Sequence, residues 1–246
     1  MGSRDDVERE QAERREYVKN LGVEYRFGCY EEKRADSCHL LGEYMEALEQ
    51  NTKAAFALFK NNCLQKEFAK SCYKYAMYVL AGKECNSSLK EMQRPLEIAC
   101  DANIAKGCRY LALVNWNEEA NKPIDTAAAV RFMKKACSLE DGEACWLLST
   151  WYMGDRTTFK TNEAGKKKEL DRSRIGRLER DMALSLEYAV KACEFDVAQS
   201  CANASRMFKI GDGIPVNVEK ANEYAEKTKL LVDIMKQNSD TGFTGH

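Results

Sequence analysis

The sequence predicts an all-α fold, an α/α solenoid of about five disulfide-linked helix-turn-helix repeats. Ten of the eleven cysteines form five short pairs, whose first members recur at steps of 34, 37, 37 and 56 residues. A period near 35 residues is typical of helical repeat arrays. Around the pairs, apolar residues follow the i, i+3, i+4, i+7 spacing of a helix with one buried face. The predicted disulfides are Cys29–Cys38, Cys63–Cys72, Cys100–Cys108, Cys137–Cys145 and Cys193–Cys201.

The N-terminal segment, residues 1–22, is interpreted as a charged helix outside the array, running from about Arg4 to Asn20. It has no apolar core like that of a signal peptide, and its acidic residues argue against a mitochondrial presequence. Residues 23–236 form the predicted repeat array. Residues 237–246 are expected to be a disordered tail.

The first helix of each repeat begins near the second cysteine of a pair. Positions three, four and seven after that cysteine share one helical face, and the residue at position four is always small. A small residue lets a neighbouring helix approach closely. Position four holds Gly42, Ala76, Ala112, Ser149 and Ser205; position three holds Leu41, Tyr75, Leu111, Leu148 and Ala204; position seven holds Met45, Val79, Asn115, Tyr152 and Phe208. Three of these helices are predicted to end at Gly82, Gly154 and Gly211.

The second helix of each repeat precedes the first cysteine of a pair. Ala99, Ala136 and Ala192 stand directly before three of these cysteines, whereas Asn62 precedes Cys63 and makes that repeat less regular. A tight turn between such helices brings two Cα atoms to roughly 5.5–6 Å, the separation that a disulfide needs. Each bridge closes a short loop and is expected to stabilise the fold by about 2.5 kcal/mol.

The period breaks once, between Cys145 and Cys193. A segment rich in Lys and Arg, at about 154–181, is predicted to be a solvated insertion, with a basic patch for an acidic partner or anionic lipid as the alternative. Cys85 is the unpaired thiol. It is interpreted as a free structural cysteine, with an exchange-active thiol favoured by the charge of Lys83 as the alternative.

Metal and catalytic constellations are weak in this sequence. The cysteine spacing is wider than that of zinc sites, and the two histidines are His39 and the terminal His246. His39 is expected to have a surface or packing role. Ser87 to Lys90 matches S-x-x-K, but the companion motifs of a β-lactamase are missing, so the match is treated as chance. No catalytic, cofactor-binding or metal-binding residue is therefore predicted.

Composition restricts the partners. The net charge of −1 gives no reason to expect nucleic acid, and no stretch approaches the roughly 20 apolar residues that span a bilayer. Five cysteine pairs indicate an oxidising compartment. The mitochondrial intermembrane space is favoured because it is reached without a cleaved presequence, and the alternatives are a secretory signal that has been trimmed and a cytosolic protein with reduced thiols. We expect a monomer whose partners are other proteins.

Three segments resemble the Sel-one-like repeat family: CYEEKRADSCHLLGEYMEAL, SCYKYAMYVLAGK and CANASRMFKIGDGIPVNVEKANEY. Within that family, which includes cysteine-rich β-lactamase-like bacterial proteins, they are most similar to the eukaryotic cytochrome c oxidase assembly factors. The resemblance runs from about Glu24 to Met235. It implies a protein of the mitochondrial intermembrane space that helps to build respiratory complex IV. It also raises heme binding through His and Met, although the central repeats contain no histidine.

The leading hypothesis is a non-catalytic scaffold whose repeat surface binds respiratory-complex assembly factors or subunits. The second is a thiol–disulfide exchange enzyme that acts on copper-delivery proteins. A β-lactamase-like hydrolase with Ser87 as nucleophile is the third.

Overall fold

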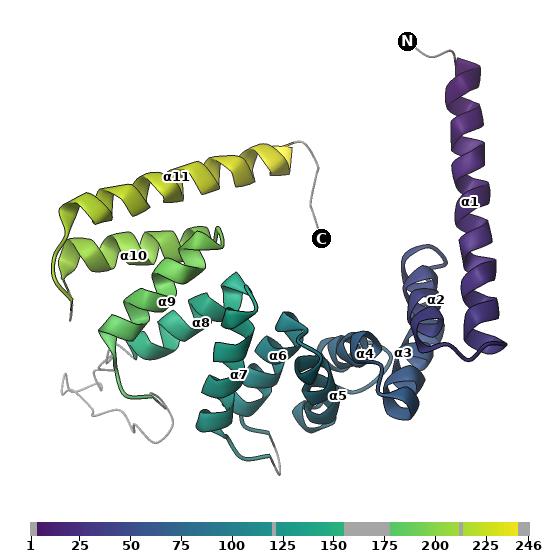
Figure 1. Cartoon of the computed structure of the whole chain (residues 1–246), viewed down its shortest axis with the longest axis horizontal. Helices are drawn as coiled ribbons and strands as arrows, with labels where there is room; N and C mark the ends of the chain where they lie inside the picture. Colours follow the sequence, from purple (N-terminus) through teal and green to yellow (C-terminus); the bar gives the residue numbers. More distant parts are fainter. Residues whose placement is uncertain (1–3, 120–121, 155–177, 212–213, 241–246) are drawn as a thin grey trace, which may run out of the picture. The chain divides into compact units, whose positions relative to one another are not determined.

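The structure, a computed structural model, describes residues 4–119, 122–154, 178–211 and 214–240. Within these ranges the chain forms eleven α-helices and no strand, which confirms the all-α prediction (Figure 1). The chain divides into two compact units. One comprises residues 1–107 with 119–122, and the other comprises residues 108–118 with 123–246.

In the first unit, each helix packs against the next one along the chain. The fully buried side chains include Leu41, Phe59, Tyr75 and Met92. They come from four successive helices, so each of these four helices contributes to the core. The helices are α1 (Arg4–Tyr30), α2 (Ala35–Ala47), α3 (Thr52–Lys66), α4 (Ala69–Ala81) and α5 (Leu89–Asp101).

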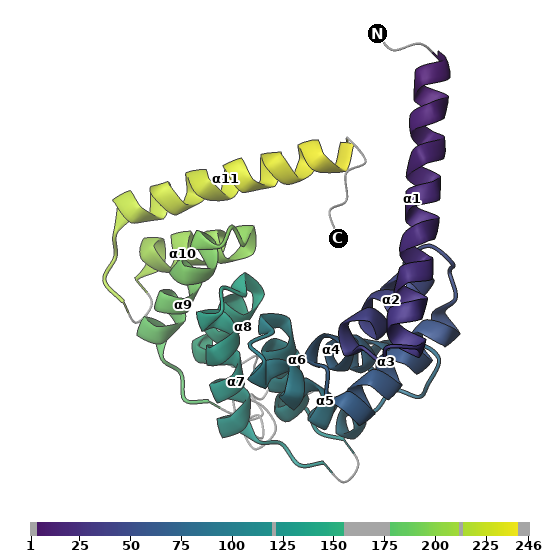
Figure 2. The ribbon, with the colours of Figure 1, turned by 45° about the vertical axis from the view of Figure 1, so that its right-hand side comes forward.

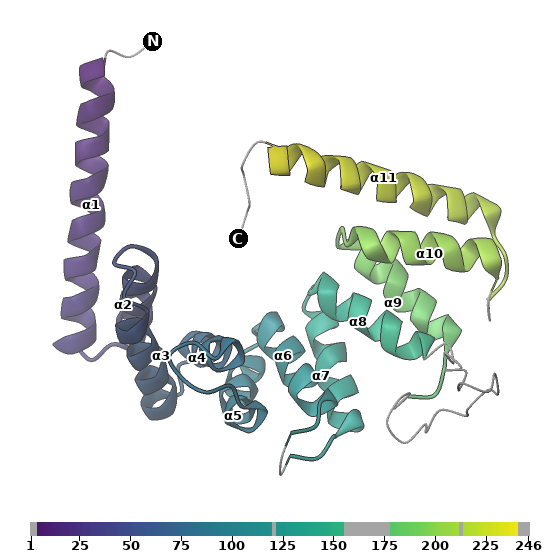
Figure 3. The same ribbon diagram turned by 180° about the vertical axis from the view of Figure 1, so that it is seen from behind.

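The second unit repeats this arrangement. From α7 onward each helix packs on its successor, and Leu111, Met133 and Leu148 are fully buried. Figure 3 shows α11 lying along α10 and continuing past its end. The helices are α6 (Ala105–Trp116), α7 (Thr126–Ser138), α8 (Gly142–Met153), α9 (Met182–Glu194), α10 (Ala198–Ile210) and α11 (Val218–Asp240).

Polar caps define the start of the second helix of most repeats. In each case a side-chain oxygen accepts a hydrogen bond from a backbone N–H of the first turn, which stabilises a helix by about 1 kcal/mol. The capping residues are Asn51, Ser88, Asp125 and Asp181. Three of the first helices, α4, α8 and α10, end as predicted at glycines with positive φ angles. These glycines are Gly82, Gly154 and Gly211.

Both terminal helices are longer than the sequence indicated. Helix α1 does not stop near Asn20 but runs on to Tyr30. Gly22 lies inside this helix against the ring of Tyr44 of α2, and a Cβ there would lie 2.5 Å from the ring, so a larger residue would force the Tyr44 side chain to move. Figure 2 shows α1 alongside α2, with its N-terminal half extending beyond it.

Helix α11 likewise extends to Asp240, so the first four residues of the predicted tail, 237–246, are helical. No proline or glycine interrupts the chain between Val218 and Asp240. Residues 241–246 lie outside the described part of the chain. None of the described helices is both long and apolar enough to cross a bilayer.

Candidate functional site

The disulfides join the last turn of one helix to the first turn of the next. Within the two units, the Cα–Cα separations of the bridged cysteines are 4.5, 4.6, 4.8 and 4.8 Å, at the short end of the range that disulfides allow. In each of these pairs the second cysteine is the fourth residue of its helix. The bridges are Cys29–Cys38, Cys63–Cys72, Cys137–Cys145 and Cys193–Cys201, and Cys100 and Cys108 are disulfide-bonded as well.

Every turn between paired cysteines contains one residue in the left-handed region. These residues have φ angles between 48° and 67°, and none of them is glycine. They reverse the chain within a few residues, which brings the two cysteines together. They are Lys33, Glu67, Asn103, Glu140 and Asp196.

The small residues in position four receive neighbouring helices, as predicted. A Cβ on Gly42 would lie 2.6 Å from Cε1 of Phe59 in α3. In the second unit, the Ser185 hydroxyl of α9 donates to the backbone oxygen of Ser149 at 2.9 Å. The predicted faces are therefore confirmed, because the residues in positions three and seven are also buried.

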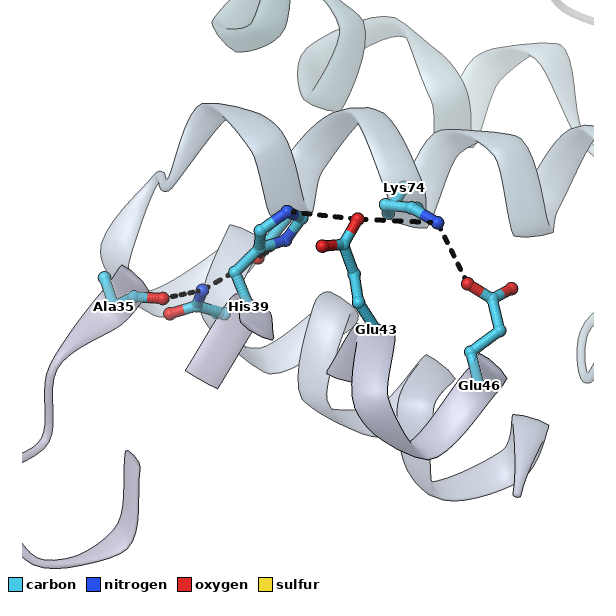
Figure 4. A network of polar contacts seen from close by, with 7 residues as sticks. Ala35, His39, Glu43, Glu46 and Lys74 are labelled. Atoms are coloured by element: carbon cyan, nitrogen blue, oxygen red, sulfur yellow. Dashed lines mark hydrogen bonds and ion pairs between the residues drawn. The ribbon is translucent and has the colours of Figure 1, made fainter. Parts of the chain in front are cut away.

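A polar network connects α2, α3 and α4 in the first unit (Figure 4). Asn62 donates to the backbone oxygen of Ala35 at 2.8 Å and to the Ser71 hydroxyl at 2.8 Å. The Ser71 hydroxyl lies 3.1 Å from Nδ1 of His39. Because the Ser71 oxygen accepts a hydrogen bond from Asn62, the Ser71 hydroxyl can donate its own proton to Nδ1 of His39. The sequence signal for this network was Asn62 itself, which stands directly before Cys63 where three other repeats have alanine.

Lys74 of α4 bridges two carboxylates of α2. Its Nζ lies 2.9 Å from Glu46 and 3.7 Å from Glu43, and Figure 4 shows it between them. The Tyr78 hydroxyl also donates to Glu46 at 2.9 Å. Burial raises the pKa of Tyr78 first, and the hydrogen bond to Glu46 raises it further. Tyr78 is therefore a neutral donor, and Glu46 is ionised because Lys74 and Tyr78 lower its pKa despite burial.

His39 is a packing residue, and it does not fit the role of a heme ligand. Its ring is 6% exposed and lies between the rings of Phe59 and Phe68, with both centroids 5.6 Å away. Nδ1 faces Ser71, and Nε2 lies 3.6 Å from Glu43. Neither nitrogen can meet an iron without displacing these groups. The other histidine, His246, lies outside the described residues.

In the second unit, Arg109 occupies the position that His39 occupies in the first, directly after the second cysteine. Its Nε donates to Asp141 at 2.9 Å, and its guanidinium also pairs with Glu143. Asp141 additionally caps α8 by accepting from the backbone N–H of Ala144. In these two repeats the position links one repeat to the next, a role that sequence reasoning missed because the residue type differs.

Cys85 is free and partly buried. Burial raises the pKa of its thiol, and the nearby carboxylate of Glu91 raises it further. The alternative in which the charge of Lys83 activates the thiol is wrong. The thiol contacts the backbone oxygen of Lys83, whereas the ammonium of Lys83 lies over the ring of Tyr78. The raised pKa favours the protonated thiol over the reactive thiolate.

The S-x-x-K match coincides with the start of α5. Ser88 caps this helix, and the Ser87 hydroxyl donates to the backbone oxygen of Leu80 at 3.5 Å. The backbone N–H of Lys90 donates to Glu119. The motif thus serves helix capping. Most of the predicted basic insertion at 154–181 lies outside the described residues.

Three curated relatives are similar to the chain over most of its length. "Cytochrome c oxidase assembly factor 7 homolog" of Drosophila melanogaster is 32% identical over 92% of both chains. "Cytochrome c oxidase assembly factor 7" of Xenopus tropicalis is 32% identical over 88% of both chains. The human protein of that name is 27% identical over 87% of both chains. No family model matches the chain.

Solved structures share the fold. The uropathogenic Escherichia coli antigen c5321, which displays an SLR fold, superposes with a TM-score of 0.65 at 15% identity, covering 87% of this chain and 40% of that one. A Sel1 repeat protein from Oxalobacter formigenes gives a TM-score of 0.60 at 14% identity, covering 88% and 83%. The helical repeats are therefore those of a Sel1-repeat solenoid, and the chain belongs to the cytochrome c oxidase assembly factor 7 family.

Proposed function

We propose that this protein is a mitochondrial assembly factor for cytochrome c oxidase, and that it acts in the intermembrane space as a disulfide-stabilised scaffold for other proteins. The observation that carries this function is the similarity to the assembly factors along nearly the whole chain. A cross-linked helical array offers a rigid surface and requires no catalytic group.

The disulfides support the intermembrane space as the location. Disulfides persist in oxidising compartments and are rare in reducing ones. The bridged cysteines are almost completely buried, so the bonds belong to the structure of the repeats. Their loss would leave a stack of short helices that depends on packing alone.

Genetic rescue tests the function. Cells in which the gene is disrupted should lose assembled cytochrome c oxidase, measured by native gel electrophoresis and by enzyme activity, and the wild-type chain should restore it. A matched version that carries a matrix-targeting presequence should not restore it. Normal oxidase levels in the disrupted cells would contradict the assembly role, and full rescue by the matrix version would contradict the location.

A further inference from the structure

The exposed side of α4 has an unusual composition. No acidic residue occurs between Ala69 and Ala81. Lys70 lies at the beginning of the helix, and Lys83 follows its end. Between them, the half-buried side chains of Tyr73 and Met77 face outward beside Lys74. This side of α4, which we call the α4 face, is thus apolar at its centre and cationic at both ends.

A depression lies at the centre of the α4 face. Its volume is about 320 Å³, and it is lined by Tyr73, Met77 and Tyr78 of α4 together with Glu46 of α2. The ammonium of Lys83 stands at one side, 5.2 Å from the centroid of the Tyr78 ring. The depression can therefore receive an apolar side chain, with the ammonium of Lys83 on one side and the carboxylate of Glu46, which is neutralised by Lys74, on another.

Neither terminal cation of the α4 face is in direct contact with a carboxylate among the described residues, although the charge of Lys83 contributes to lowering the pKa of Glu46. Lys74, in the middle, already binds Glu43 and Glu46. Lys70 and Lys83 form no ion pair with any described residue. Glu84 is adjacent to Lys83 in sequence, but its carboxylate accepts a hydrogen bond from Thr52 of α3 at 2.6 Å.

We propose that the α4 face binds an acidic segment of a partner protein, with an apolar side chain in the depression and carboxylates on Lys70 and Lys83. Eleven helical positions separate Lys70 from the end of α4, so the two cations are roughly 18 Å apart. An extended segment of roughly six residues covers that distance. Opposite charges fix the register of such a segment and speed its association. This inference rests on the scaffold function proposed above.

The test measures binding of a short synthetic peptide by fluorescence anisotropy. The probe carries a central Leu-Phe pair with a glutamate cluster on each side, and the full chain is used in its oxidised state. The Lys70→Glu/Lys83→Glu double variant should bind about tenfold more weakly than the wild type, because two attractions become repulsions. Raising the salt concentration should weaken wild-type binding as well.

The matched control is the Lys53→Glu/Lys90→Glu double variant. Lys53 and Lys90 are exposed in the first turns of α3 and α5, so the change in net charge is the same while the α4 face is intact. Its affinity should stay within about twofold of the wild type. Circular dichroism and thermal melting of both variants verify that they fold, so that weaker binding reports on the surface.

Several outcomes would overturn the proposal: equal weakening by both double variants, equal binding of a probe with lysines in place of the glutamates, or no binding by the wild type. The proposal would also fail if the wild type dimerised and the Lys70→Glu/Lys83→Glu variant did not, because a second copy of the chain would then occupy the α4 face. The proposed function is judged separately by rescue. If Lys70→Glu/Lys83→Glu restores cytochrome c oxidase as fully as the wild type, the scaffold role stands and the acidic partner segment falls.

Discussion

The Nζ atom of Lys66 lies 3.8 Å from the Sγ atom of Cys38. Lys66 also donates to the backbone oxygen of Lys33 at 2.6 Å, which holds its ammonium beside the Cys29–Cys38 disulfide. Cys29 and Cys38 are 4% and 6% exposed, whereas the other bridged cysteines are at most 1% exposed. The first disulfide thus combines a neighbouring cation with the greatest access to solvent.

We predict that Lys66→Met slows reduction of the Cys29–Cys38 disulfide about threefold, because an ammonium stabilises the thiolate that leaves from Cys38. The measurement is timed treatment with dithiothreitol, followed by alkylation and mass spectrometry of each cysteine. Lys53→Met, which changes an exposed lysine of α3, should leave the rate unchanged. Identical rates for Lys66→Met and the wild type would show that the cation has no influence on this bond.

Reduction of all the disulfides should lower the thermal unfolding midpoint substantially. Each bridge is expected to contribute about 2.5 kcal/mol, and a chain of this size loses roughly 2–4 °C per kcal/mol. The measurement is calorimetry with and without reductant. Cys85→Ser, which removes the free thiol, should show the same shift as the wild type. A midpoint that does not respond to reductant would contradict a structural role for the cross-links.

Gly42→Ala should destabilise the protein, although the same change on an exposed helical surface stabilises by about 1 kcal/mol. The added Cβ would lie 2.6 Å from the ring of Phe59, which is fully buried and cannot move aside. Overpacking of this kind costs about 1–3 kcal/mol. Chemical denaturation measures the effect. Combining Gly42→Ala with Phe59→Leu should show a favourable coupling energy, and additive effects would mean that the two positions do not meet.

The helical repeats were predictable because the information is local and periodic. The spacing of Gly42, Ala76 and Ala112 after the cysteines defined a buried face, and the structure buries it. The ends of α1 and α11 were not predictable from that period, since both helices continue beyond the repeat. Gly22 illustrates the difficulty: it resembles a helix breaker, yet it makes room for Tyr44.

The candidate site depended on contacts between residues far apart in sequence. Nothing near Lys74 in the chain indicates that Glu43 and Glu46 lie opposite it. The interpretation of Cys85 as a free cysteine is confirmed, but the sequence could not show that burial and Glu91 of the following helix raise the pKa of its thiol. The left-handed residues of the turns, such as Glu67 and Glu140, were hidden because glycine, the usual signal, is absent there.

His39 should make the stability of the protein depend on pH. Burial lowers the pKa of its imidazole below the ordinary value, with Lys74 and Lys70 acting in the same direction and Glu43 opposing them. The unfolded chain therefore binds a proton at this residue more readily than the folded chain. The stability linked to His39 is complete above its unfolded pKa, near 6.5, and is lost as the pH falls through the lower folded value.

His39→Gln removes this titration and should flatten the decline in stability between about pH 7 and 5. Urea denaturation at a series of pH values measures the free energy of unfolding of both proteins. The variant is less stable at pH 7, because it loses the contact with Ser71 and the packing between Phe59 and Phe68, so the comparison rests on the slopes. Ser71→Ala serves as the control, since it breaks the same contact but keeps the imidazole, and its slope should persist. Parallel curves for the wild type and His39→Gln would assign the acid sensitivity to the carboxylates instead.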